Sequence, residues 1–255
     1  MSTGFSIELQ GLRVKYAIIS DIHGNLEALG AALEEIRRIS PDKVLCLGDL
    51  VGYGASPGEC IEMARQAVRV TVAGNHDHGA AGLADIRYFN SYARHAVMWT
   101  AAQLSREHLT YLAALPLVHV EGARLRIVHA TPSDPGQWNY IFTREQARAE
   151  FEAFDEQVCF VGHSHQAGIF EMLEDGTVGP AGDHVKVLQG RRYMINVGSI
   201  GQPRDGDPRG CICIYDEATG EVAMVRVAYD VAGAQKRIIG AGLPPILAHR
   251  LSYGE

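Results

Sequence analysis

Short apolar runs and amphipathic segments alternate along the first part of the chain. Residues 14–20, 44–47 and 68–72 form runs rich in Val, Ile and Leu, which predict buried strands. Between the first two runs, apolar residues recur at helical spacing over residues 26–36. The order strand–helix–strand–helix–strand favours parallel strands joined by right-handed crossovers.

Capping residues mark several predicted helix starts. Asn25 can cap the helix that follows the first strand. Ser56 stands at an N-cap position, with Pro57 at the first helical position and Glu59 two residues later. A further capping box begins at Thr143 and predicts a helix that runs to about residue 154.

The pattern changes after about residue 166. Residues 84–104 and 105–115 read as helices, and 125–128 and 158–161 read as strands. The later part contains short strands joined by turns, which predict an antiparallel or mixed second sheet. These strands are expected at 168–173, 185–188, 192–197, 210–215 and 222–228.

The simplest domain organisation is one domain over residues 1–255. We divide it into an N-terminal βαβ part at about 12–166, a strand-rich part at about 167–230 and a helical tail at 231–255. The tail has two short helical stretches that break at Pro244 and Pro245. Residues 171–191 match no motif that we can name.

Composition restricts the partners and the compartment. A net charge of −7 argues against broad nucleic-acid binding, which needs a basic face. The five cysteines are odd in number and form no Cys-x-x-Cys motif, which favours a reducing compartment. Cys211 and Cys213 share a strand face, where a core role is preferred to metal binding. No apolar run reaches the roughly 20 residues of a membrane span, and residues 1–10 show no secretory signal, so a cytoplasmic location and no membrane partner are expected.

Polar residues with metal-binding chemistry follow most of the predicted strands. Because such loops converge at one edge of a sheet, we expect two carboxylates, an amide and several imidazoles to meet at one point. Oxygen and imidazole ligands without thiolate favour two ions of Mn, Fe, Zn, Ni or Co. Asp49 follows a glycine that permits a sharp turn, and a carboxylate can bridge two cations, so Asp49 is the candidate bridging ligand. The polar residues that we expect to meet at this point are Asp21, His23, Asp49, Asn75, His76, His129, His163 and His165.

A pair of divalent ions suits the hydrolysis of a phosphate ester. Two metals roughly 3.5–4 Å apart lower the pKa of a shared water and neutralise the phosphate oxygens during in-line attack. Four positive charges, less two carboxylates and one hydroxide, leave about one positive charge to attract a small phosphorylated substrate to a negative chain.

Five motifs in order resemble the calcineurin-like metallophosphoesterases. They are Asp21-x-His23, Gly48-Asp49, Gly74-Asn75-His76-Asp77, the lone His129 and Gly162-His163-Ser164-His165. Together they are specific, although each alone is weak. The block from Asn196 to Arg204 further resembles the small prokaryotic YfcE-type phosphodiesterases.

The resemblance implies an α/β fold, a four-layer αββα sandwich with two mixed sheets. It implies Asp21, His23, Asp49 and His165 on one metal, and Asp49, Asn75, His129 and His163 on the other. It also implies that His76 contacts the substrate and protonates the leaving oxygen, and we expect Asp77 to orient His76 by hydrogen bonding.

Several roles on the substrate side stay open. Arg204 is predicted to grip a phosphate, and the alternative is a loop salt bridge with Asp205 or Asp207. Asn25 and Tyr53 are further candidate substrate ligands. Trp138 and Tyr140 can stack on an aromatic group, although packing at the core or rim is preferred.

The predicted function is metal-dependent hydrolysis of phosphate esters by metal-activated hydroxide attack. The resemblance favours phosphodiesters. The alternatives are a phosphoprotein (Ser/Thr) phosphatase, a dinucleoside-polyphosphate hydrolase and, from another class, a catalytically weak metal-binding scaffold. The sequence leaves the oligomeric state open.

Overall fold

Two mixed β-sheets form the centre of the protein. The computed structural model describes residues 14–255, so the expectation for residues 1–10 lies outside the described residues. One six-stranded sheet has the order β3 (Val70–Thr71), β2 (Lys43–Cys46), β1 (Lys15–Ile19), β11 (Gly210–Asp216), β12 (Glu221–Val227) and β9 (His184–Lys186). The other has the order β4 (Val118–Glu121), β5 (Leu125–Val128), β6 (Val158–Val161), β10 (Arg192–Asn196), β7 (Gly168–Met172) and β8 (Val178–Pro180).

The predicted parallel strands are present in both sheets. β1 pairs with β2 and β2 with β3 in parallel, and β6 lies parallel between β5 and β10. The carboxyl ends of parallel strands meet at one edge of a sheet, so the loops that follow these strands lie close together.

A mixed second sheet is present as predicted, but only some of the later strands belong to it. β9, β11 and β12 extend the sheet of β1, whereas β7, β8 and β10 extend the sheet of β6. The apolar pattern shows that a strand is buried, but not beside which strand it lies. The contacts that decide this are non-local, such as the antiparallel pairing of β11 with β1.

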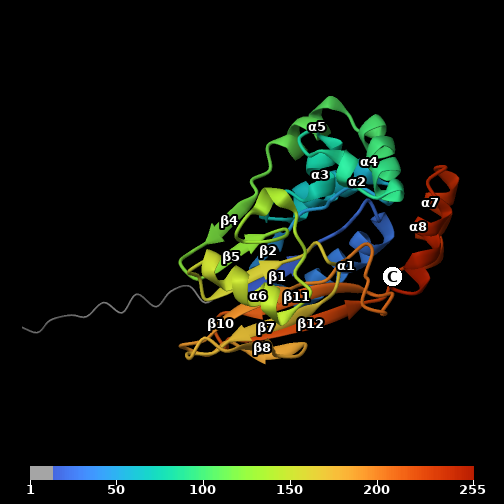
Figure 1. Ribbon diagram of the computed structural model, residues 1–255. Helices are drawn as coiled ribbons and strands as arrows, with labels where there is room; N and C mark the ends of the chain where they lie inside the picture. The colour runs from blue at the N-terminus through green and yellow to red at the C-terminus, as the bar shows by residue number, and fades with distance from the viewer. Residues whose placement is uncertain (1–13) are drawn as a thin grey trace, which may run out of the picture.

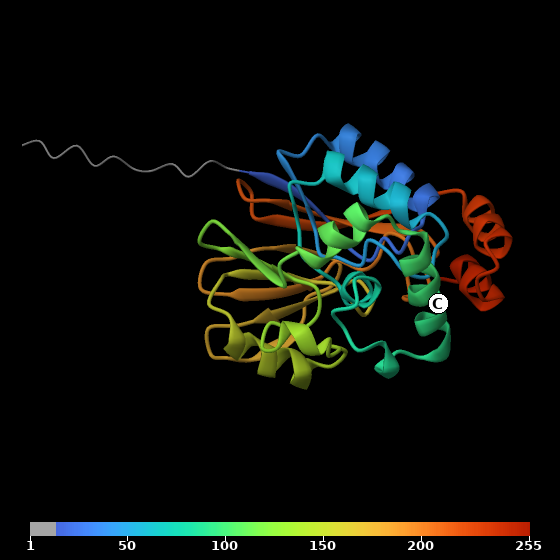
Figure 2. The same ribbon diagram turned by 90° about the horizontal axis from the view of Figure 1, so that it is seen from above.

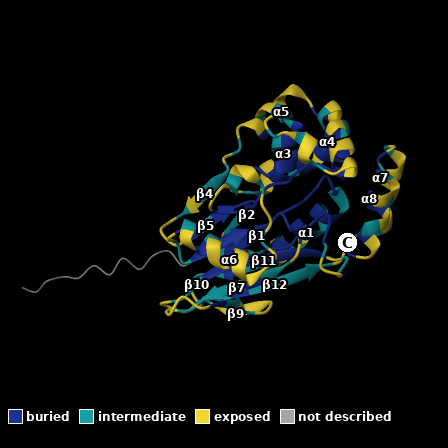
Figure 3. Ribbon diagram, in the orientation of Figure 1, coloured by how far each residue is buried: buried dark blue, intermediate teal, exposed yellow. Residues whose placement is uncertain are grey.

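Strand alternation divides the apolar side chains between layers. Tyr16 and Ile18 of β1 lie between the two sheets with Phe160 of β6, whereas Ala17 and Ile19 face the helices. Figure 3 shows that burial is concentrated in the strands, while the outer helix faces are exposed.

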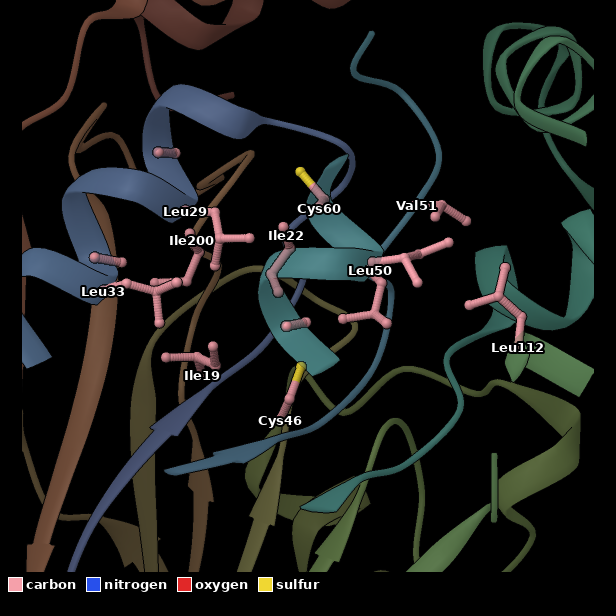
Figure 4. Packing of buried hydrophobic residues seen from close by; sticks show 14 of the residues in the cluster. Ile19, Ile22, Leu29, Leu33, Cys46, Leu50, Val51, Cys60, Leu112 and Ile200 are labelled. Atoms are coloured by element: carbon pink, nitrogen blue, oxygen red, sulfur yellow. The ribbon is translucent and has the colours of Figure 1, made fainter. Parts of the chain in front are cut away.

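Helices cover the outer faces of both sheets, which confirms the predicted four-layer arrangement. α1 (Leu26–Ile39) and α2 (Pro57–Ala67) lie on one side of the sheet pair, and α6 (Arg144–Glu150) lies on the other (Figures 1 and 2). Leu29 and Leu33 of α1 pack towards Ile19, as Figure 4 shows. Phe151, just beyond α6, packs on Val128 and Met194.

The remaining helices lie around one end of the sheets (Figure 1). They are α3 (Asn75–Ala80), α4 (Ser91–Gln103), α5 (Arg106–Ala113), α7 (Val231–Gly240) and α8 (Pro245–His249), with short 3₁₀ turns at Ile86–Tyr88, Pro135–Gln137, Phe151–Ala153 and Arg250–Ser252. Within residues 14–255, no helix combines the length and the apolar character needed to cross a bilayer. All five cysteines are buried and free, which confirms the core interpretation of Cys211 and Cys213.

Two predicted helix starts are confirmed and two predictions need correction. Asn25 caps α1, and Thr143 forms the capping box of α6. α2 begins at Pro57 as expected, but the Ser56 side chain makes no capping hydrogen bond. The helix predicted over 84–104 is shorter than expected. It begins after Asn90, which caps α4, and a 3₁₀ turn and an extended residue precede this cap.

Gly201 provides a test of how tightly two loops approach. Its amide donates to the Asp21 carbonyl oxygen, and an added Cβ would lie 1.8 Å from the Ile22 carbonyl oxygen. Gly201→Ala should therefore lower the free energy of unfolding by about 1–3 kcal/mol, as overpacking does. Denaturant unfolding measures this change.

Gly30 is the matched control within α1. An added Cβ there meets no atom within 4 Å, so Gly30→Ala should raise stability by about 0.5–1 kcal/mol. Equal effects of the two substitutions would contradict the close approach at Gly201.

Candidate metal centre

The predicted ligands follow strands of both sheets and meet between their ends. Asp21 and His23 follow β1, and Asp49 follows β2. His129 comes directly after β5 and His163 shortly after β6. The remaining predicted ligands are Asn75, which begins α3, and His165.

Five of these residues adopt left-handed backbone conformations. This region is uncommon for residues other than glycine, and such strain costs on the order of 1–3 kcal/mol each. The sharp turns let residues two positions apart direct their side chains to one point. The five φ angles are 54° at Asp21, 52° at His23, 52° at Asp49, 64° at His163 and 60° at His165.

Backbone hydrogen bonds between loops hold the strained turns. The Asp21 amide donates to the Gly48 carbonyl oxygen at 3.0 Å, and the His23 amide donates to the Asp49 carbonyl oxygen at 2.9 Å. The Gly201 amide binds the Asp21 carbonyl oxygen at 2.9 Å. Three separate loops therefore fix each other through main-chain contacts.

The structure brings the ligand atoms into two overlapping clusters. Asp21, His23, Asp49 and His165 form one cluster, in which the ligand atoms lie within 4.8 Å of one another. Asp49 also belongs to the second cluster, together with two histidines, and its ligand atoms lie within the same distance of one another. The two histidines of the second cluster are His129 and His163. All members of both clusters are buried.

Backbone carbonyls fix the orientation of the imidazoles. In three rings Nδ1 contacts a carbonyl oxygen and so carries the proton, which directs the Nε2 lone pair towards the cluster. These contacts are His23 to Val51 at 3.1 Å, His129 to Leu47 at 2.7 Å and His165 to Gln202 at 2.6 Å. His163 is reversed: its Nε2 lies 2.8 Å from the Trp138 carbonyl oxygen, which leaves Nδ1 as the ligand atom.

Unpartnered buried atoms show that the clusters fit divalent cations. Nε2 of His23 and Nε2 of His165 lie only 3.1 Å apart, although both carry lone pairs that repel each other unless a cation lies between them. Buried polar atoms without partners are rare in proteins. Here they include Oδ1 of Asp21, Oδ2 of Asp49, Oδ1 of Asn75 and Nε2 of His129.

The charges of the clusters also favour a bound cation. Burial lowers the pKa of His163 to about 4 and that of His165 to about 3, so both rings are neutral near pH 7. Burial alone would lower the pKa of His129, but the charges of Asp49 and Asp21 outweigh it and raise this pKa to about 9.

His76 lies beside the clusters in an aromatic setting. Its ring centroid is 4.4 Å from that of Tyr53 and 5.1 Å from that of Phe89. An added Cβ on Gly52 would lie 2.3 Å from Nδ1 of His76, so the glycine makes room for the ring. Burial lowers the pKa of His76 well below its usual range, despite the nearby Asp49 charge. The ring is therefore neutral and lines the adjoining cavity.

Asp77 does not orient His76, and that prediction was wrong. The Asp77 carboxylate accepts hydrogen bonds from the amides of Asp49 at 2.8 Å, Gly74 at 3.1 Å and Val51 at 3.3 Å. Nδ1 of His76 has no partner. The carboxylate lies beneath the loops because it satisfies three buried amides, and burial together with the Asp49 charge raises its pKa to about 7.

Arg204 makes neither of the predicted loop salt bridges. Asp205 instead pairs with Arg226 at 2.5 Å, and Asp207 pairs with Arg209 at 2.6 Å. Arg204 lies over the Tyr53 ring at 5.6 Å, and its Nε is buried without a partner. Its guanidinium lines the cavity.

The other candidate substrate ligands separate into two cases. Tyr53 lines the cavity, but Asn25 is outside the set of described residues that line it. The Asn25 side chain accepts from the Ala28 amide at 3.1 Å and donates to the Gly201 carbonyl oxygen at 2.8 Å. We therefore assign Asn25 to the loop structure rather than to substrate.

Sequence reasoning missed how residues 138–142 support His163. The Tyr140 ring stacks on the His163 ring at 4.1 Å, and Phe142 stacks on Tyr140 at 5.1 Å. Trp138 supplies its carbonyl to the same imidazole. The alternation of aromatic residues at 138, 140 and 142 after His129 was the available signal, but nothing in it indicates the partner.

The chain matches known proteins over most of its length. A family model for the calcineurin-like phosphoesterase superfamily domain matches residues 14–220. An uncharacterized protein of Methanocaldococcus jannaschii is 40% identical over 242 residues, which is 94% of this chain and 98% of the relative. A metallophosphoesterase from Sphaerobacter thermophilus has a crystal structure that is 40% identical, with a TM-score of 0.83, covering 95% of this chain and 100% of that chain.

A crystal structure from Pyrococcus horikoshii OT3 is 20% identical, with a TM-score of 0.78 and coverage of 94% and 98% of the two chains, and shows the shared fold. The E. coli phosphoesterase YfcE is a weaker match, 17% identical with a TM-score of 0.43, covering 84% of this chain and 100% of that chain. The family model covers well over half of the chain, and the relatives at 40% identity cover nearly all of it. The chain therefore belongs to the calcineurin-like phosphoesterase superfamily, a family of metal-dependent hydrolases of phosphoric esters.

Proposed function

We propose that this enzyme binds two divalent transition-metal ions and hydrolyses phosphodiesters in preference to other phosphate esters. The observation that carries the proposal is the pair of buried clusters that share Asp49. Two ions on a common carboxylate are the arrangement suited to in-line displacement at phosphorus.

The ligand assignment follows the two clusters. Asp21, His23, Asp49 and His165 would hold one ion. Asp49, His129 and His163 would hold the other, with the unpartnered Oδ1 of Asn75 as a fourth ligand. Bound together, the ions would supply a water of lowered pKa and neutralise charge on the phosphate. Carboxylate, amide and imidazole ligands favour Mn, Fe, Zn, Ni or Co.

The chain's own side chains would then act on the leaving group and the anion. His76 borders the cavity next to the cluster, where its imidazole would contact the leaving group and, in its protonated form, pass a proton to the departing oxygen and return to the neutral ring. Tyr53 packs against His76 and holds its ring in place. Arg204 donates from one amino group to Oε1 of Gln202 at 2.8 Å, but its Nε has no partner. Its guanidinium lines the same cavity, where it can bind a phosphate oxygen.

The charge of the cavity supports a diester substrate. Among the described residues that line it, Arg204 is the one Lys or Arg side chain. A monoanionic diester needs little positive charge beyond the metals, whereas a polyphosphate would need more. We also propose a cytoplasmic location, which the five free, buried cysteines support.

Turnover with added metal tests the function and distinguishes an enzyme from a scaffold. The protein with Mn²⁺ should hydrolyse bis(p-nitrophenyl) phosphate and lose this activity with EDTA. Asp49→Asn removes a negative ligand from both clusters, so the variant should lose both ions by elemental analysis and lose turnover. A variant that keeps two ions would contradict the shared role of Asp49, and no turnover by the Mn²⁺ form of the native protein would favour the scaffold.

Substitution of His76 tests its role on the leaving group. His76→Ala should keep both ions but lose roughly 10²- to 10⁴-fold in rate, the usual contribution of a general acid. The loss should be smaller for a p-nitrophenolate leaving group, which needs little protonation. His95→Ala on the exposed face of α4 is the control. Loss of metal along with activity would make His76 structural.

Substitution of Arg204 tests the substrate charge. Removing a charge-assisted hydrogen bond costs about 1.5–3 kcal/mol, or roughly ten- to 150-fold in rate. Arg204→Ala should reduce kcat/KM for a phosphomonoester or polyphosphate much more than for a simple diester. The exposed Arg209, which pairs with Asp207, provides the control Arg209→Ala. Equal losses on all three substrates would assign Arg204 to loop structure.

A further inference from the structure

The cavity beside the metal clusters is larger than a phosphate group needs. Its volume is about 860 Å³, within the range of about 300–1,000 Å³ for small-molecule sites. Asp49, Asn75 and the cluster histidines line one side. Segments 83–90 and 136–140 contribute an outer wall, which the reaction at phosphorus does not use.

The outer wall is aromatic and close to neutral. Tyr88, Phe89 and Trp138 line it together with apolar residues. Its one acidic residue, Asp85, forms a bidentate ion pair with Arg87 through both carboxylate oxygens. A wall of this kind favours an uncharged, apolar group over a second phosphate or a charged peptide.

Trp138 is fixed in place beside the clusters. Its φ angle of 58° is left-handed, and its carbonyl oxygen is held by His163. Its ring lies edge-to-face with His129 at 6.0 Å and with His78 at 5.7 Å. Strained residues held by their surroundings cluster at ligand sites. The indole is thus positioned before any ligand arrives.

Tyr88 differs from the other tyrosines of the site. Its side chain is 88% exposed and lines the cavity, and the aromatic pairs found among residues 14–255 do not include it. Tyr140, by contrast, already stacks on His163 and Phe142. Tyr88 therefore has ring surface free for a ligand, and the partly exposed Trp138 lines the same cavity.

Two carboxamides complete the wall. Asn90 and Gln137 line the same cavity. The Oδ1 of Asn90 accepts from the Ala93 amide, which leaves its amino group free to donate. Carboxamides pair well with the edges of planar rings that carry donors and acceptors, as nucleobases do.

We propose that the outer wall binds a planar, uncharged ring of nucleobase size in an ester group of the substrate, with Trp138 and Tyr88 as its stacking partners. The inference rests on the proposed phosphodiesterase function, because it names the group that the cavity accepts next to the reacting phosphate. It assigns specificity to residues that hold neither the metals nor the leaving-group proton.

Binding of two product-like monoesters tests the proposal without relying on turnover. Phenyl phosphate and cyclohexyl phosphate carry the same charge and differ in the flatness and π-surface of the ring. Isothermal titration calorimetry on the Zn²⁺-loaded protein should give a lower Kd for phenyl phosphate, by roughly five- to 150-fold, the range of one stacking contact. Equal Kd values would overturn the proposal.

Substitutions in the outer wall show which side chains cause the preference for phenyl phosphate. Trp138→Leu and Tyr88→Leu should each bring the two Kd values closer together by weakening phenyl phosphate only, with metal content unchanged by elemental analysis. The Tyr88 side chain is largely exposed and belongs to neither cluster, so its variant stays informative if Trp138→Leu disturbs His163. Tyr92→Leu, at a half-exposed position on α4, should keep the full preference. A preference that survives in both wall variants would overturn the assignment.

A separate measurement distinguishes an error in the proposed function from an error in the proposed ring site. Bis(p-nitrophenyl) phosphate hydrolysis is measured on the same preparations. A lack of turnover in the Mn²⁺ form of the native protein would contradict the proposed function, whereas a selective Kd for phenyl phosphate would still support the ring site.

Discussion

The burial of two carboxylates next to facing imidazole lone pairs is the constraint on which this structure depends. Oδ1 of Asp21 and Oδ2 of Asp49 have no hydrogen-bond partner, and Nε2 of His23 faces Nε2 of His165 at 3.1 Å. Such an arrangement is unfavourable unless positive charge is present. It therefore accounts for both the ion-binding capacity of the clusters and the raised pKa of His129.

The rest of the fold holds these groups against their repulsion. Left-handed turns direct the side chains inwards at Asp21, His23, Asp49, His163 and His165. Backbone contacts between the loops, and the Asp77 carboxylate beneath them, keep the turns in place. Because the two sheets pack face to face, ligands from β1 and β2 in one sheet reach those from β5 and β6 in the other.

The sequence predicted the residues of the site more completely than it predicted the order of the strands in the sheets. Asp21, Asp49 and the four predicted histidine ligands come together because they follow strands that the apolar runs revealed, and the motifs identified the family. The split of the later strands between two sheets could not be predicted, because it depends on non-local pairing such as that of β11 with β1. The role of Asp77 was missed for a related reason: its partners are main-chain amides, which no residue type indicates.

A crystal structure with Mn²⁺, analysed by anomalous scattering, tests the central claim most directly. The account predicts two anomalous peaks roughly 3.5–4 Å apart, both within bonding distance of the Asp49 carboxylate, as in two-metal sites. A single peak, or two peaks of which only one contacts Asp49, would contradict it.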